Sequence, residues 1–119
     1  MSATPDIKRN QIGIQIMSNE GTLFVAANTA TLQVTTNAGD TQKVLITGPG
    51  DFHAELAGTG EGNVLTKQTV GHGEYAVKGY SVKGGKLIPS QVRAYGTRRL
   101  GFNDTGGDAD FNDAIVEIL

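Results

Sequence analysis

The sequence predicts an all-β protein: a single antiparallel β-sandwich of roughly eight to ten short strands. Three observations predict it. Turn signals such as "NAGD", "GTGEGN" and "KGGK" recur along the chain, which contains 17 glycines. Short runs with two-residue apolar alternation fill the space between these turns. No stretch shows the sustained period of 3.6 residues that an amphipathic helix requires.

The strands are expected in order between these turns. Ile12, Ile14 and Ile16 share one face of "QIGIQIM", and Leu32 and Val34 share one face of "ATLQVTT". The later runs are "QKVLIT", "FHAELAG", "VLTKQTV", "YAVKGYSV", "SQVRAYGTRRLGF" and the closing "AIVEIL". With 119 residues and no linker or repeat, residues 1–119 are predicted to form a single domain.

Composition and charge exclude several classes of function. The net charge of −2 offers no basic surface for nucleic acid, and no apolar run is long enough to insert into a membrane. The absence of cysteine excludes disulfides and thiolate metal ligands. The first residues, "MSATPDIKRN", lack the apolar core of a cleaved signal peptide. We expect a soluble protein that is cytoplasmic or exported without such a signal.

The stretch before the last strand, "GFNDTGGDADFNDAIVEIL", concentrates acidic side chains. Such crowding is costly unless a cation offsets the repulsion, and calcium accepts about 6–8 oxygen ligands, carboxylates and amide carbonyls alike. An EF-hand is rejected, because Asp113 replaces its glycine and Leu119 its glutamate. Zinc is disfavoured because only His53 and His72 could provide nitrogen, and magnesium because it retains more water. Calcium is therefore the predicted cofactor, since four carboxylates could neutralise two ions; an ordinary solvated turn is the alternative. The four are Asp104, Asp108, Asp110 and Asp113.

These residues resemble the signature loop of the calcium-dependent fucose-binding lectin II family, small soluble bacterial lectins that bind fucose and mannose. The loop reads acidic-x-x-x-D-x-D-[YF]-N-D-[AG]-[VI]-V, and residues 104–116 match it. A second match is "ANTATLQVTTNAGDTQ", which includes Asn28, Thr29, Asn37 and Gln42. The resemblance runs from about residue 21 to the end, and residues 1–17 are an extra N-terminal segment without a counterpart.

The resemblance implies a β-sandwich that holds two adjacent calcium ions, to which sugar hydroxyls bind directly. It also implies a homo-oligomer, expected to be a dimer, with mannose- or fucose-containing glycans as partners. The metal ligands that it implies are Asn37, Asp104, Asp108, Asp110, Asn112 and Asp113. The sugar-binding residues that it implies are Asn37, Ala38, Gly39, Asp104, Thr105, Asp108, Asp110 and Asp113.

Two further expectations concern single positions. The two residues after the asparagine tune sugar preference in this family, and Ala38 lacks a hydroxyl that serine-bearing relatives offer. Preference is therefore expected to lean toward mannose-type sugars. Phe111, between two predicted ligands, is expected to point into the sandwich and anchor the loop.

Two other functions were weighed. A structural calcium-stabilised β-domain of a bacterial surface or secreted protein would use the same acidic loop to clip strands without binding sugar, but it would not need the Asn37 segment. An enzyme is disfavoured. Glycoside hydrolysis uses two separated carboxylates, one of them in an apolar setting, and the packed aspartates do not match that arrangement.

Overall fold

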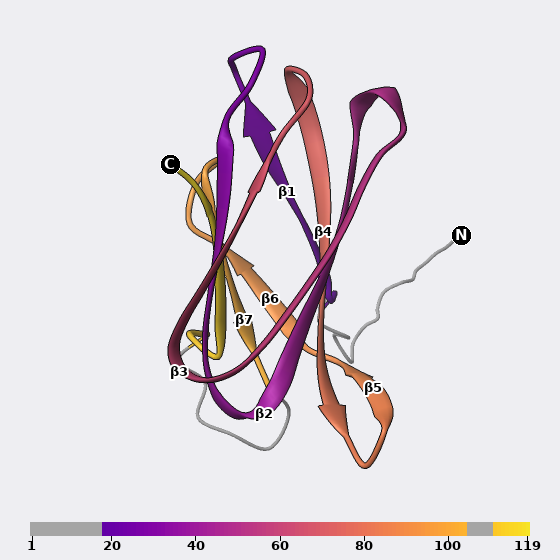
Figure 1. Cartoon of the computed structure of the whole chain (residues 1–119), viewed down its shortest axis with the longest axis vertical. Coiled ribbons are helices and arrows are strands. Elements are labelled where there is room, and N and C mark those ends of the chain that lie inside the picture. Colours follow the sequence, from indigo (N-terminus) through magenta and orange to yellow (C-terminus); the bar gives the residue numbers. More distant parts are fainter. Residues whose placement is uncertain (1–17, 105–110) are drawn as a thin grey trace, which may run out of the picture.

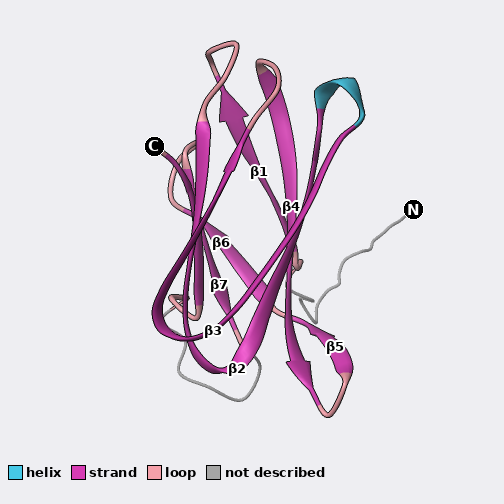
Figure 2. Ribbon diagram, in the orientation of Figure 1, coloured by secondary structure: helices cyan, strands magenta, loops and turns pink. Residues whose placement is uncertain are grey.

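The chain forms an all-β structure in which every paired strand is antiparallel (Figure 2). The structure is a computed structural model that describes residues 18–104 and 111–119. The N-terminal segment 1–17, with its expected "QIGIQIM" strand, lies outside the described residues. The elements are β1 (Glu20–Val25), β2 (Thr31–Gly48), the short 3-10 turn η1 (Pro49–Asp51), β3 (Phe52–Gln68), β4 (Gly73–Lys83), β5 (Lys86–Pro89), β6 (Gln91–Ala94), β7 (Arg99–Asn103) and β8 (Ala114–Ile118).

The predicted fold class is confirmed, but two strands are much longer than expected. β2 has 18 residues and β3 has 17. They pair with each other as one ribbon, whose register shifts between Thr36 and Asn37 and between Ala38 and Gln42. Figure 1 shows that both strands bend at the same end of the molecule. The four short runs expected between residues 30 and 70 are therefore the arms of this bent ribbon.

The bent ribbon connects the two layers of the sandwich. The first arm of β2, residues 31–36, pairs with β8 and continues through β7 to β6. The second arm, residues 41–47, pairs with β4 and continues to β1. On the other side β1 meets the second layer directly, because the Phe24 N–H donates to the Thr97 carbonyl at 2.9 Å. The sheet is consequently almost closed on itself.

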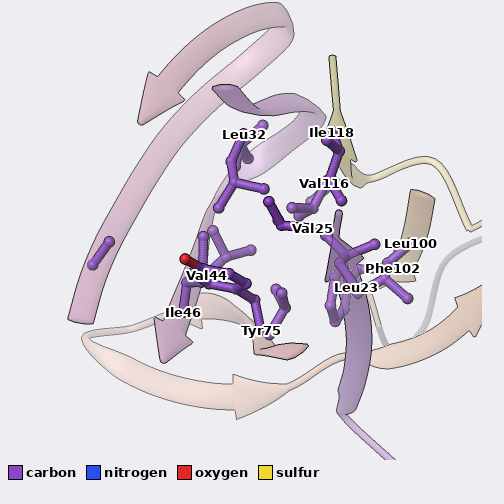
Figure 3. Close-up of a cluster of buried hydrophobic side chains, with 14 of the residues drawn as sticks. Leu23, Val25, Leu32, Val44, Ile46, Tyr75, Leu100, Phe102, Val116 and Ile118 are labelled. Carbon is purple, nitrogen blue, oxygen red and sulfur yellow. The ribbon is translucent and has the colours of Figure 1, made fainter. Parts of the chain in front are cut away.

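Apolar side chains from both layers fill most of the interior. They alternate along each strand, as expected when one face of a strand is buried. In Figure 3 side chains of β1, β2 and β4 face those of β7 and β8. Tyr75 packs edge-on against Phe52, and its hydroxyl donates to the Gly71 carbonyl at 2.6 Å. The largest fully buried apolar side chains are Leu23, Val25, Leu32, Val34, Val44, Ile46, Tyr75, Val77, Leu100, Phe102 and Val116.

The interior changes from apolar to polar at the end where the ribbon bends. Along the first arm of β2 the buried positions continue from Leu32 and Val34 to Thr36. In the opposite layer Gln42 and Ser81 are paired neighbours, and both are buried. β7 runs toward the same end and leads into the acidic residues before β8 (Figure 1). The predicted site therefore lies over the polar end of the interior.

Candidate functional site

Asn37 joins the bend of the ribbon to the end of the acidic turn. Its N–H donates to the Asp113 carbonyl at 2.8 Å, and its Nδ2 donates to the Asn112 carbonyl at 2.8 Å. Its Oδ1 accepts the N–H of Gly62, on the other strand of the ribbon, at 2.9 Å. The register shift in β2 begins at this asparagine, so its side chain bridges the ribbon and the turn. The structure thus brings together predicted ligands 75 residues apart in the chain.

Asp104 and Asp113 hold the two ends of the acidic turn together. The Asp104 N–H donates to Asp113 Oδ2 at 2.7 Å, and the Asp113 N–H donates to the Phe102 carbonyl at 3.1 Å. Asp104 itself is buried, and only 12% of its side chain is exposed. The Ser81 hydroxyl donates to Asp104 Oδ1 at 3.2 Å. A buried carboxylate is tolerated when hydrogen bonds and a nearby cation compensate for its lost hydration.

That cation is Lys83, which the sequence did not single out. Its Nζ lies 3.3 Å from Asp104 Oδ2 and 2.5 Å from Asp40 Oδ2. Hydrogen bonds to Asp40 first, and to Asp104 second, raise the pKa of Lys83 above its usual value. The second carboxylate, Asp40, directly follows Ala38 and Gly39. No local pattern signals this bridge, because the three residues meet only after β2, β4 and β7 have folded together.

Phe111 corrects one expectation. It is buried, but it does not point into the sandwich. Leu100 and Phe102 occupy the inner face of β7, so Gly101 between them faces outward, and Phe111 lies against it. A Cβ at Gly101 would come within 2.2 Å of the Phe111 carbonyl oxygen. The Arg93 guanidinium covers the aromatic ring at 4.2 Å from its centroid. Phe111 therefore anchors the turn on the outer face of β7.

The backbone at Phe111 shows how closely the turn is held. Phe111 has a φ of +55°, a left-handed conformation that costs a non-glycine residue about 1–2 kcal/mol. The contacts with Gly101 and Arg93 compensate for this strain. The next two residues are Asn112 and Asp113, so the anchor sets where these predicted ligands begin.

The remaining predicted residues have different outcomes. Ala38 is half-buried and pairs with Gly60, whereas Gly39 is exposed and has open space around it. Thr105, Asp108 and Asp110 lie outside the described residues. His53 and His72 lie at the other end of the sandwich; His72 packs edge-on against Phe24. A surface hollow of about 590 Å³ beside His53 is also at that end, between the arms of β3, so it is separate from the acidic turn.

The donor chemistry suits calcium. Residues 18–104 and 111–119 bring together no three carboxylate, histidine or cysteine side chains that could hold a metal by themselves. They do place Asn37, Asp104, Asn112 and Asp113 in one hydrogen-bonded group whose side chains offer oxygen donors. Calcium prefers such oxygen ligands, and the group contains no sulfur or imidazole for zinc. A complete site would need ligands from the acidic turn in addition.

Fold and turn together define the class of protein, an all-β sandwich of the lectin type. Among solved structures the chain is similar to the Chromobacterium violaceum lectin CV2L, determined in complex with α-methyl-fucoside. The TM-score is 0.57 and the sequence identity 25%, over 87% of this chain and 96% of CV2L. The likeness confirms the resemblance to fucose-binding lectins that the acidic turn predicted.

The other comparisons add no relative. No family model matches the chain, and no curated protein matches it. The similar structure is that of a lectin, which supports a binding function over an enzymatic one. In the described part of the chain, no helix is long and apolar enough to cross a membrane.

Proposed function

We propose that this protein is a calcium-dependent lectin that binds fucose- or mannose-type monosaccharides. The observation that carries the proposal is the structural likeness to CV2L, whose structure contains α-methyl-fucoside, over most of both chains. The likeness extends over the same chain in which Asn37 is bonded to the acidic turn. Sequence pattern and three-dimensional similarity thus support the same kind of site.

The proposed ligands to two calcium ions are Asn37, Asp104, Asp108, Asp110, Asn112 and Asp113. Bound calcium would provide the positive charge to which two neighbouring sugar hydroxyls bind. Carboxylates beside the sugar would accept its hydroxyl protons in charge-assisted hydrogen bonds. The chain prepares this arrangement by bonding Asp113 to the Asp104 N–H and by fixing Asn37 on both sides. Rigid ligands lose less conformational freedom on binding, which favours affinity.

The first test is thermal unfolding in chelator, in calcium, and in calcium with methyl α-fucoside, methyl α-mannoside or a glucoside. A ligand that binds only the folded protein raises the unfolding temperature by mass action. We expect calcium to raise it, and fucoside or mannoside to raise it further. An unfolding temperature that ignores both calcium and sugar would overturn the proposal.

Paired variants make the test specific to the acidic turn. Asp113→Asn removes one carboxylate charge with little change in shape, and the protein should lose both calcium stabilisation and sugar binding. Asp51→Asn is the matched control, because Asp51 is exposed in η1 at the other end of the sandwich. Its left-handed φ of +63° is one that asparagine adopts readily. Isothermal titration calorimetry with calcium, then with fucoside at saturating calcium, separates the two binding steps.

A structural calcium-stabilised β-domain is the second candidate. It is favoured by the fact that both polar groups of the Asn37 side chain are already engaged with backbone atoms, as in a strand clip. This candidate predicts that calcium raises the unfolding temperature and that no sugar changes it further. The sugar arms of the melt therefore discriminate between the two functions.

A further inference from the structure

Lys83 connects two segments of the proposed site that are far apart in the chain. Its ammonium group lies 2.5 Å from Asp40 and 3.3 Å from Asp104. Asp40 belongs to the bend of β2 that carries Ala38 and Gly39, and Asp104 opens the acidic turn. Lys83 ends β4, so it reaches both segments from the first layer of the sandwich. It is the described side chain that contacts both carboxylates.

The surroundings of Lys83 are rich in oxygen atoms. The Asp104 carboxylate is nearly enclosed, and Ser81 donates to one of its oxygens. Gln42, which is 1% exposed and paired with Ser81, has an Oε1 without a hydrogen-bond partner. The Nε2 of the same side chain donates to the Asp40 carbonyl at 3.2 Å. A positive charge at this place therefore offsets a carboxylate that would otherwise be buried and uncompensated.

We propose that Lys83 is a positioning residue of the saccharide site, an internal cation that ties the Ala38–Gly39 bend to the acidic turn and competes with calcium for the Asp104 carboxylate. The inference rests on the proposed function. It goes beyond that function because it assigns a role to Lys83 and Asp40, which are not among the proposed ligands. The two roles have opposite consequences for calcium and for sugar.

Removing the ammonium group should strengthen one binding step and weaken the other. In Lys83→Met, Asp104 loses its competing cation, so calcium should bind about 5-fold more tightly or better, within the usual range for coupled binding. The Ala38–Gly39 bend loses its tie to Asp104, so fucoside or mannoside should bind about 5-fold more weakly at saturating calcium. A variant that is merely damaged would lose affinity for both.

A second variant separates the two roles. Asp40→Asn weakens the tie to the bend but leaves the contact between Lys83 and Asp104 in place. Sugar affinity should fall as in Lys83→Met, while calcium affinity should stay within about 2-fold of the wild type. Asp40 is exposed, so this variant is expected to fold even if Lys83→Met does not. Lys83→Arg keeps the charge and should restore most of the sugar affinity.

The matched control is Lys43→Met. Lys43 forms an equally direct pair with Glu55 at 2.8 Å, but Glu55 is on β3 and neither residue touches the acidic turn. This variant should leave both affinities unchanged. Calcium and fucoside titrations by calorimetry, with far-UV circular dichroism to verify folding, provide the measurements.

The outcomes separate the two proposals. A wild-type protein that binds calcium and sugar, with Lys83→Met and Asp40→Asn behaving as Lys43→Met does, overturns the role of Lys83 alone. Weaker calcium binding in Lys83→Met also overturns it. A wild-type protein that binds neither ligand overturns the proposed function itself, and the role of Lys83 fails with it.

Discussion

The two ends of the sandwich interior are held together by different interactions. At one end Leu32, Tyr75 and Phe52 belong to a continuous apolar core. At the other end Gln42, Ser81 and Asp104 are buried with polar groups that need partners. Apolar burial is non-directional, whereas buried polar groups are stable only with specific neighbours. The apolar end should therefore determine stability in all conditions, and the polar end should respond to cations and ligands.

The largest expected effect is at the apolar end. Leu32→Ala removes a fully buried side chain and should lower the free energy of unfolding by about 2–5 kcal/mol. Urea denaturation should show the same loss in chelator and in calcium, because the cavity is remote from the acidic turn. The control is Leu87→Ala, since Leu87 is exposed on β5. A loss at Leu32 that calcium largely reverses would show that the two ends are not independent.

Gly101→Ala should have the next largest effect. The added Cβ would clash with the backbone of Phe111, and such overpacking typically costs about 1–3 kcal/mol. Because Phe111 precedes Asn112 and Asp113, calcium affinity should fall together with stability. Gly71→Ala is a suitable control, since a Cβ there would meet no atom within 4 Å. Unchanged calcium binding in Gly101→Ala would argue against the anchoring role of Phe111.

Asn37→Ala tests the link between the ribbon and the turn. It removes the side-chain bonds to the Asn112 carbonyl and the Gly62 N–H, and each bond in a partly solvated setting contributes about 1 kcal/mol. Sugar binding should be lost while most of the stability remains. Asn63→Ala, at the same bend, removes only a bond to the Thr59 carbonyl and should bind sugar normally. Normal sugar binding by Asn37→Ala, measured by calorimetry, would remove this residue from the proposed site.

Ala38→Ser should alter preference with little effect on stability. The added hydroxyl offers a polar contact beside the proposed site, and the ratio of fucoside to mannoside affinity should rise severalfold. Titrations with both methyl glycosides at saturating calcium measure the ratio. An unchanged ratio would mean that position 38 does not contact the sugar.

The smallest expected effect concerns a surface pair away from both ends. The hydrogen bond and charge of Lys43 lower the pKa of Glu55 below its usual 4.5. A lowered carboxyl pKa stabilises the folded protein above the unfolded-state pKa, and this contribution disappears as the pH falls through the folded-state pKa. Wild type should therefore be slightly more stable than Glu55→Gln at neutral pH and equally stable in acid. Urea midpoints across this pH range would show any different trend.

Local pattern carried much of the fold. Alternation and turn residues identified the strands, including all four arms of the ribbon, and "KGGK" became the β4–β5 hairpin with positive φ at Gly84 and Gly85. Continuity between the arms was missed, because a polar, glycine-containing segment has the same pattern whether it ends a strand or bends one. The direction of Phe111 was also missed, because it depends on the space that Gly101 leaves on β7.

The sequence by itself determined the fold class, the concentration of carboxylates before the last strand, and the resemblance that linked them to Asn37. These features are encoded within short windows, in residue type and spacing. Only the tertiary structure decided that Lys83 bridges Asp40 and Asp104, and that Arg93 covers Phe111. Such contacts join strands distant in the chain, and their energy depends on distances and burial that exist only once the layers have packed.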